Sequence, residues 1–336
     1  MISVVTATEP RDLPELATFL TRIYRLTDSH PLADPALLEW KYFWPRSDWS
    51  GSRSYVIKKH GRIVAHCGAC PVTFCLPDGS AVQSLTMTDW AADPSSPGAG
   101  IMPFRKLMGM VRASFAVGAI ATLQIVLGLG FRQEGEALTY SAWLRPWREF
   151  RARPLTLRSA LRTLHGWTHP VRDANDVDEH WEFTRVAEFD SSLHPVLSPA
   201  NRPWTTCGRT LADLNYLLKY PYLEMEAFVL LRRGELAGYF IVGKADWEAR
   251  VLDLRVGSEN ANDWKGACSV MTKAIGLDPG IGRVRILASV PMLQRALLSN
   301  GYWCQFREPI FVHDRSHVLD RAFPVGLQFF DGDSGF

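Results

Sequence analysis

The stretch TDWAADPSSPGAGIMPFRKLM, residues 88–108, decides the fold that this sequence predicts. It begins with the pattern of a strand and ends with that of a helix, and prolines and glycines fill the join at 93–100. The N–H groups at a helix N-terminus are unpaired, and glycines let an anion approach them without meeting a Cβ. Arg105 and Lys106 stand in the first turns, where the helix dipole usually favours acidic residues. The join therefore predicts a loop that holds a polyanion, and the alternative is a solvated helix face behind a glycine turn.

The elements around the join recur in the same order later in the chain. In residues 1–149, a strand and two helices precede two hairpins, and a crossover of strand, helix and strand follows the join. Residues 181–336 repeat this order of elements, although not the letters. Residues 150–180 are Arg-rich, then acidic, and lack strand periodicity. We expect two mixed α/β domains, 1–149 and 181–336, joined by a linker at 150–180.

The order of elements and the loop Pro97-Gly98-Ala99-Gly100-Ile101-Met102 resemble the GNAT superfamily of acyl-CoA-dependent N-acyltransferases, in a tandem two-domain form. In that family the backbone amides of an Arg-Gly-x-Gly-x-Gly/Ala loop hold the pyrophosphate of coenzyme A. Gly98 and Gly100 match this loop, whereas Pro97 replaces the basic residue and Met102 the last small one. The sequences GLGF at 128–131 and SNGYW at 299–303 also resemble a helix-then-glycine step of the family. The resemblance implies two GNAT-like domains, each a mostly antiparallel mixed sheet flanked by helices.

The resemblance implies that acetyl-CoA or another acyl-CoA binds to the first domain. The expected contacts are the backbone of the strand before the loop, the loop itself and one basic residue of the helix: Trp90, Ala91, Ala92, Gly98, Ala99, Gly100, Ile101, Met102 and Arg105. The corresponding bend of the second copy, SENANDWKGACS, has only Gly266 and places Asn262 and Asp263 where they can cap the helix. We therefore expect the second domain to be a degenerate copy that shapes the acceptor cleft or the pairing of the domains.

Acyl transfer to an amine needs a base for the amine and a proton for the leaving thiolate. Strand alternation places Asp89 on one face with Ala91 and Asp93, opposite Thr88, Trp90 and Ala92. Asp89 is the candidate base, and a surface or hairpin-paired carboxylate is the alternative. Tyr140 is the candidate acid, and a core aromatic is the alternative. No cysteine or serine stands in a recognisable nucleophile setting, so we expect direct attack in a ternary complex.

The second helix of the chain is rich in tryptophan. Trp40, Trp44 and Trp49 surround it, and the resemblance would place it over the acceptor. This cluster predicts either an aromatic acceptor pocket or a helix packed on the sheet. The expected function is transfer of an acyl group from coenzyme A, or from an acyl carrier protein, to an amine of a small molecule or sugar. The alternative is a catalytically inactive tandem pair that binds a metabolite or scaffolds a biosynthetic complex.

Charge and cysteine usage exclude several other classes of function. The chain has 37 Lys plus Arg against 35 Asp plus Glu, so no nucleic-acid partner is expected, and a Fem-type transferase that uses aminoacyl-tRNA fits poorly. Cys67 and Cys70 lie three apart on a strand and should point to opposite faces, and Asp331-Gly332-Asp333 predicts a solvated turn, so no metal is expected.

The cysteines and the N-terminal sequence favour the cytoplasm. The six cysteines lie mostly in apolar stretches, which is typical of buried thiols in a reducing compartment, and the N-terminus lacks the pattern of a secretory signal. Residues 113–130 form an apolar run, but Gly118, Gln124, Gly128 and Gly130 interrupt it. We therefore expect a strand and a short helix there and no membrane span.

Overall fold

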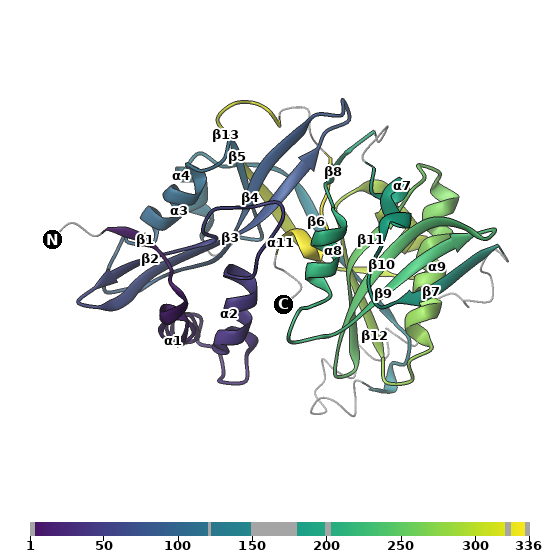
Figure 1. Cartoon of the computed structure of the whole chain (residues 1–336), viewed down its shortest axis with the longest axis horizontal. Coiled ribbons are helices and arrows are strands. Elements are labelled where there is room, and N and C mark those ends of the chain that lie inside the picture. Colours follow the sequence, from purple (N-terminus) through teal and green to yellow (C-terminus); the bar gives the residue numbers. More distant parts are fainter. Residues whose placement is uncertain (1–3, 120–121, 149–179, 199–202, 320–323, 333–336) are drawn as a thin grey trace.

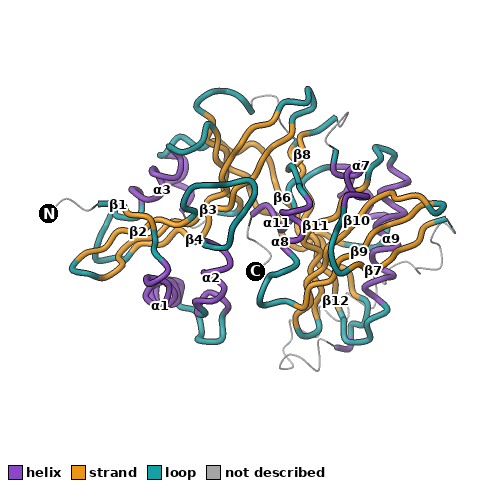
Figure 2. Tube along the Cα trace, viewed as in Figure 1, coloured by secondary structure: helices purple, strands orange, loops and turns teal. Residues whose placement is uncertain are grey.

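The computed structural model of the chain describes residues 4–119, 122–148, 180–198, 203–319 and 324–332. Its strands join one 14-stranded mixed sheet with helices packed against it, which confirms the predicted mixed α/β class. Figure 2 shows strands running through both parts of the molecule, with helices on their faces.

The helices and strands follow the predicted order in both halves. The first half contains β1 (Val5–Ala7), α1 (Leu13–Tyr24), α2 (Pro35–Tyr42), β2 (Ser54–Lys59), β3 (Arg62–Cys75), β4 (Ala81–Ala92), α3 (Ile101–Met108), β5 (Ala113–Val117), α4 (Leu123–Gly128) and β6 (Arg132–Trp143). The second half contains β7 (Trp181–Val186), α7 (His194–Leu197), β8 (Thr205–Cys207), α8 (Leu211–Leu217), β9 (Glu224–Arg232), β10 (Glu235–Ala245), β11 (Glu248–Val256), α9 (Ala261–Gly276), β12 (Arg283–Ala288), α10 (Pro291–Ser299), β13 (Trp303–Asp314), β14 (Val325–Gly326) and α11 (Phe329–Gly332).

Local signals set the ends of several elements. His60 and Gly61 both have positive φ, 52° and 76°, as the two-residue turn between β2 and β3 requires. Each crossover helix ends at a glycine in the left-handed region, Gly130 (φ 89°) after α4 and Gly301 (φ 82°) after α10. The next residue is a buried aromatic in both halves, Phe131 and Tyr302, which confirms the predicted helix-then-glycine step.

The last strands of the two halves are exchanged within the sheet. The strand order is β1-β2-β3-β4-β5-β13-β6-β12-β11-β10-β9-β7. β13 of the second half pairs with β5 over Ile310–Asp314, and β6 of the first half pairs with β12 over Leu138–Trp143. One sheet therefore crosses the boundary that the sequence suggests between 1–149 and 181–336. The linker predicted at 150–180 lies outside the described residues except for His180.

Each half contains a pair of parallel strands that separate partway along their length. β4 pairs with β5 over Ser84–Thr86 only, and β11 pairs with β12 over Glu248–Val251 only. β4 then continues to Ala92 and β11 to Val256 without a strand neighbour on that side among the described residues. The pairing register of both long strands shifts close to the point of separation. In each half, two parallel strands therefore diverge beside a β-bulge, and we call these two places the first and second wedges.

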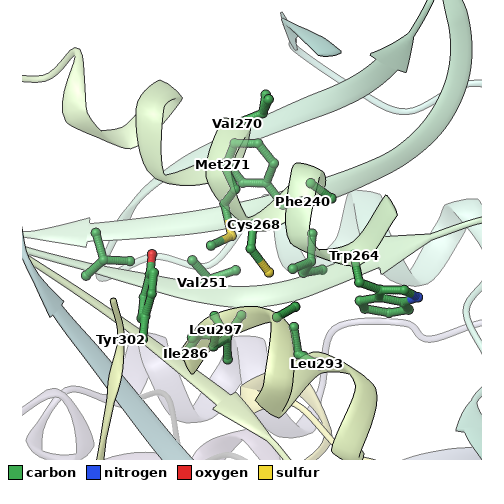
Figure 3. Close-up of a cluster of buried hydrophobic side chains, with 14 of the residues drawn as sticks. Phe240, Val251, Trp264, Cys268, Val270, Met271, Ile286, Leu293, Leu297 and Tyr302 are labelled. Carbon is green, nitrogen blue, oxygen red and sulfur yellow. The ribbon is translucent and has the colours of Figure 1, made fainter. Parts of the chain in front are cut away.

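The hydrophobic core continues across the exchanged strands. Figure 3 shows the cluster between α9, α10 and the sheet of the second half, where Cys268, Met271, Leu297 and Tyr302 lie close together. Tyr140 of β6 belongs to this same cluster. The apolar run at 113–130 divides into β5 and α4, and no helix in the described ranges is both long and apolar enough to cross a membrane.

Candidate functional site

The bulge in β4, beside the first wedge, is held in place by buried side chains. Asp89 has a positive φ of 47°, which is uncommon for a residue other than glycine. The ring of His66 holds this backbone conformation in place. The His66 Nδ1 atom lies 2.8 Å from the Asp89 carbonyl oxygen and must donate a hydrogen bond to it. The Ser54 hydroxyl lies 2.9 Å from the other ring nitrogen. Burial lowers the pKa of His66 to about 4, despite the opposing field of Asp89, so the ring is neutral and holds the bulge through hydrogen bonds.

The Asp89 side chain is part of a buried ion pair. Its Oδ2 lies 2.6 Å from Lys41 Nζ and also accepts a hydrogen bond from the Tyr42 hydroxyl. Burial alone would raise the pKa of Asp89, but the Lys41 ammonium and the hydrogen bonds from Lys41 and Tyr42 lower it below the ordinary value. Asp89 is therefore ionised, and its Oδ2 already accepts hydrogen bonds from both Lys41 and Tyr42.

Gly68 on β3 leaves the space in which the Tyr42 phenol lies. A Cβ at this position would meet the Tyr42 hydroxyl at 2.2 Å, so any larger residue would displace the ring. The Tyr42 ring also meets His66 edge-on, at 5.5 Å between centroids. No local pattern in the sequence indicates this cluster, because Lys41 and Tyr42 come from α2 and reach β4 only in the folded chain.

The predicted alternation along β4 is wrong at the bulge. Met87 and Trp90, three residues apart, pack in the same cluster under α3. Trp90 Nε1 donates to the Gly100 carbonyl at 2.8 Å, and its ring lies 4.5 Å from that of Phe104. Ala91 packs on the opposite side, with α1 and α2. The extra residue of the bulge breaks the two-residue period, so Trp90 covers the start of α3.

Thr88 stands directly before the bulge and has an unsatisfied hydroxyl. The residue is 6% exposed, and its Oγ1 has no hydrogen-bond partner among the residues that the structure describes. Buried hydroxyls in native proteins nearly always have a partner. Thr88 lies in the part of β4 beyond its pairing with β5.

The loop between β4 and α3 is partly closed by its own turns. The amides of Ala99, Ile101 and Met102 donate to carbonyls of the same loop at 3.1–3.3 Å. In the described chain, the amides of Gly98 and Gly100 have no acceptor. Gly98 has a φ of 79°, and a Cβ there would meet nothing within 4 Å. The loop therefore has two unpaired amides, that of the exposed Gly98 and that of the buried Gly100, rather than the longer run that the sequence predicts.

The start of the loop is braced by Asp93. Its Oδ1 accepts hydrogen bonds from the amide and hydroxyl of Ser95, at 2.9 and 2.7 Å. Its Oδ2 lies 2.8 Å from the guanidinium of Arg22. The Ser95 hydrogen bonds and Arg22 lower the pKa of Asp93 to about 2. Arg105 is exposed on α3, and no described carboxylate lies within ion-pair distance of it.

Tyr140 is not brought together with Asp89. It lies 3% exposed in the core cluster of the second half, because β6 is placed between β12 and β13. Burial and the nearby Cys304 raise its pKa. Its surroundings match the core aromatic that the sequence left as the alternative.

Glu308 is a candidate that the sequence analysis missed. Its Oε1 lies 3.1 Å from the position that a Cβ of Gly118 would occupy, at the end of β5 and across the first wedge from β4. It is half-buried, and no ion pair to it is seen in the described ranges. Burial raises its pKa, and the charge of Arg285 opposes this only in part. It reaches the first half only through the strand exchange, which no local pattern reveals.

The second wedge is filled by the chain's own C-terminal segment. Gln328 Oε1 accepts from the Leu254 amide at 2.7 Å, and Gln328 Nε2 donates to the Leu254 carbonyl at 2.8 Å. These are the backbone groups of β11 beyond its pairing with β12. The helix after this wedge is capped by Asn260, not by the predicted Asn262 and Asp263, and Asp263 instead lies 2.5 Å from Arg232.

A buried charge cluster ties this segment to the rest of the second half. Arg209 lies 3.1 Å from Asp253 and 2.7 Å from Asp331, and the Tyr239 hydroxyl donates to Asp253 at 2.6 Å. Asp331 is 1% exposed in α11, so the predicted solvated turn is wrong there. α11 lies between β4 and β11, at the centre of Figure 1, and Thr86 Oγ1 donates to the Asp331 carbonyl at 2.6 Å. Asp333 lies outside the described residues.

A small cavity of about 20 Å³ lies where the two halves meet beside α2. Its walls are Trp40, Lys41, Arg46, Arg53, Ala69, Cys70, Tyr216 and Phe330. Of the predicted tryptophan cluster, only Trp40 reaches it and stacks on Tyr216 at 4.7 Å between centroids. Trp44 is 39% exposed, and Trp49 packs with the α3 cluster.

The cysteines follow the strand geometry that the sequence predicts. Cys67 packs under α3, whereas Cys70 lines the cavity on the other face of β3. All six cysteines are free thiols, and Cys67, Cys207 and Cys268 are buried. In the part of the chain that the structure describes, no group of three or more His, Cys, Asp or Glu residues is arranged to hold a metal ion.

No protein-family model and no curated protein matches the sequence. Solved structures do match. A GCN5-related N-acetyltransferase from Anabaena variabilis superimposes with a TM-score of 0.63 at 12% identity, covering 93% of this chain and 73% of that one. A probable N-acyltransferase from Enterococcus faecalis gives 0.61 at 12% identity over 94% of this chain and 72% of its own.

A tandem GNAT protein from the clavulanic acid biosynthesis pathway matches nearly the full length of this chain. It matches with a TM-score of 0.57 at 10% identity, over 93% of this chain and 98% of its own. At these identities the likeness shows the fold. The chain therefore has the tandem GNAT fold, and the predicted fold class is confirmed.

Proposed function

We propose that this chain, built on the tandem GNAT fold, is an N-acyltransferase that moves an acyl group from an acyl-CoA thioester to an amine. The observation that carries the proposal is the contrast between the two wedges. The second is occupied by Gln328, whereas the first has an unpaired strand edge, a bulge and the unsatisfied Thr88 hydroxyl. The first half is therefore the one that binds the donor.

The residues of the first wedge fit such a donor. The edge of β4 beyond its pairing with β5, with the backbone of Trp90, Ala91 and Ala92, would pair with the pantetheine amides, and Thr88 would gain its missing partner. At Trp90 the donor would replace the Tyr24 hydroxyl, which donates to the Trp90 carbonyl at 3.0 Å. The loop of Gly98, Ala99, Gly100, Ile101 and Met102 would receive the diphosphate, with Arg105 as the nearby cation. Because the other described amides of this loop already donate to its own carbonyls, and Gly98 and Gly100 alone are left, we expect weaker binding than a full loop of donors would give. The thioester supplies an activated acyl group.

The charges around the bulge divide the proton transfers between different residues. Asp89 has a lowered pKa and is occupied by Lys41 and Tyr42, so it positions these two proton donors rather than acting as the base. Glu308, with its raised pKa and no described ion pair, is the better base for the incoming amine. The amine nitrogen attacks the thioester carbonyl, its proton passes to Glu308, the C–S bond breaks, and the thiolate takes a proton from the Lys41 and Tyr42 pair.

The acceptor is a small molecule, such as a free amine or an amino sugar, attacked directly in a ternary complex. An acyl carrier protein is the alternative donor, because it presents the same pantetheine thioester. If neither donor binds, the chain is instead a catalytically inactive tandem pair that binds a metabolite or scaffolds a pathway.

The test is release of free thiol from acetyl-CoA, long-chain acyl-CoA and acyl carrier protein with a panel of amines. Wild type should release thiol with at least one combination of donor and amine. Its kcat/KM should rise as the pH passes the raised pKa of Glu308, because the base must be deprotonated. In Glu308→Gln, kcat/KM should no longer rise with pH in this range. Its kcat should fall by at least about 100-fold, within the usual range for a general base. Glu235→Gln, an exposed position on β10, is the matched control and should change neither. No thiol release with any donor would overturn the proposal in favour of the inactive pair.

A further inference from the structure

We propose that the cavity beside α2 binds a carboxylate of the acceptor, so that the substrate is an amine that also carries a carboxylate, as an amino acid does. This inference rests on the proposed function and identifies its acceptor class. The cavity lies next to the bulge, because Lys41 both lines it and contacts Asp89. A group held there would direct its amine toward the first wedge.

Among the described residues, the cavity lining brings together three cations and no carboxylate. Arg46 is held by both oxygens of Asp48, at 2.6 and 2.8 Å, and Lys41 by Asp89. Arg53 has no described carboxylate within 4.0 Å. Its recorded hydrogen bonds go to neutral oxygens, the Trp44 carbonyl and the Tyr216 hydroxyl.

Burial makes this excess charge significant. Arg53 is 5% exposed, and charged side chains are almost never buried unless paired. A guanidinium has five N–H donors in a planar fork that matches a carboxylate, and these two bonds leave donors free. A bound carboxylate would therefore supply the counter-ion that no described residue supplies to Arg53.

The walls of the cavity limit the size of the ligand. The Tyr216 ring stacks on Trp40 on one side and meets Arg46 at 5.3 Å, and Phe330 lies 5.7 Å from Arg46. The free volume of about 20 Å³ is close to what one ordered water needs. One oxygen of a flat carboxylate fits this volume, whereas a tetrahedral phosphate or sulfate is too large.

The second half contributes to this cavity, although its own wedge is filled. Tyr216 comes from α8 and Phe330 from α11, whereas Arg53 and Trp40 come from the first half. Tyr216 also donates to the Trp40 carbonyl at 2.6 Å and so fixes the cavity wall. The acceptor site therefore forms only when both halves are present.

The experiment compares L-amino acids with their carboxamides, which differ only in the carboxylate. In thiol-release assays on the full chain, wild type should prefer the acids by about 10- to 100-fold in kcat/KM, the ratio expected for a charge-assisted hydrogen bond. Arg53→Gln should abolish this preference through KM rather than kcat, and Arg53→Lys should keep part of it. Arg255→Gln is the control, since Arg255 is equally buried at 5% and bonded to backbone carbonyls, but lies outside the cavity lining.

The outcomes separate this inference from the proposed function. Thiol release with equal kcat/KM for acids and amides, or an unchanged preference in Arg53→Gln, would overturn the carboxylate site while leaving the acyltransferase standing. If no amine supports thiol release, calorimetry with the same acids and amides decides. The site is supported only if wild type binds the acids and Arg53→Gln does not. Tighter binding of O-phosphoethanolamine than of any amino acid would also overturn it.

Discussion

Replacing Gln328 tests whether the C-terminal segment fills the second wedge as a structural element. In Gln328→Leu the side chain keeps a similar volume but can no longer bond the amide and carbonyl of Leu254, which is fully buried. Each buried backbone group left without a partner costs about 1–3 kcal/mol, so the free energy of unfolding should fall by about 2–6 kcal/mol. This is a large loss for a single side chain that contacts no proposed substrate.

Urea denaturation followed by tryptophan fluorescence measures this loss. Gln83→Leu is the matched control, because Gln83 is exposed and donates to the Asp48 carbonyl where water can replace it. It should change the free energy of unfolding by less than about 0.5 kcal/mol. Calorimetric binding of acyl-CoA should be the same in both variants, since the donor site belongs to the first wedge. A change for Gln328→Leu no larger than that for Gln83→Leu would refute the reasoning.

Two further predictions concern the bulge. An unfolded histidine titrates near 6.5 while burial holds the pKa of His66 at about 4, so its contribution to stability is complete above pH 6.5 and falls by about 3 kcal/mol by pH 4. Unfolding free energies measured across this range should be flatter for His66→Gln, and identical slopes would contradict the assignment. Gly68→Ala should lower kcat about 100-fold, because its Cβ would lie 2.2 Å from the Tyr42 hydroxyl and move it from Asp89. Gly266→Ala, whose Cβ would lie 2.5 Å from a Trp181 ring atom, should keep kcat, and equal losses in both would argue for a general packing effect.

The parts of the fold that were predictable from the sequence depend on local signals. The turn at His60-Gly61 needs positive φ at both positions, and the crossovers end at a glycine followed by a buried aromatic. Helix and strand patterns therefore placed the elements in both halves, and their order carried the resemblance that the structural matches confirm for the fold.

The parts that were not predictable depend on contacts between distant segments. The exchange of β6 and β13 has no local signal, because either strand would satisfy the same alternating pattern in either half. Glu308 and Tyr140 therefore lie in surroundings that their own neighbours in sequence do not indicate. The bulge at Asp89 and the tail residue Gln328 are likewise defined by partners far along the chain.

The central claim is that the loop before α3 holds the diphosphate of an acyl-CoA, and one calorimetric comparison tests it. Gly98 and Gly234 both have a φ of 79°, and a Cβ on either meets nothing within 4 Å, so alanine strains both equally, by about 1–2 kcal/mol. Titration with acetyl-CoA and a long-chain acyl-CoA should show binding to wild type and Gly234→Ala. Binding to Gly98→Ala should be at least tenfold weaker, because its Cβ would stand in the open space from which an anion reaches the Gly98 amide. Equal affinity in all three proteins, or no heat from wild type with either thioester, would contradict the account.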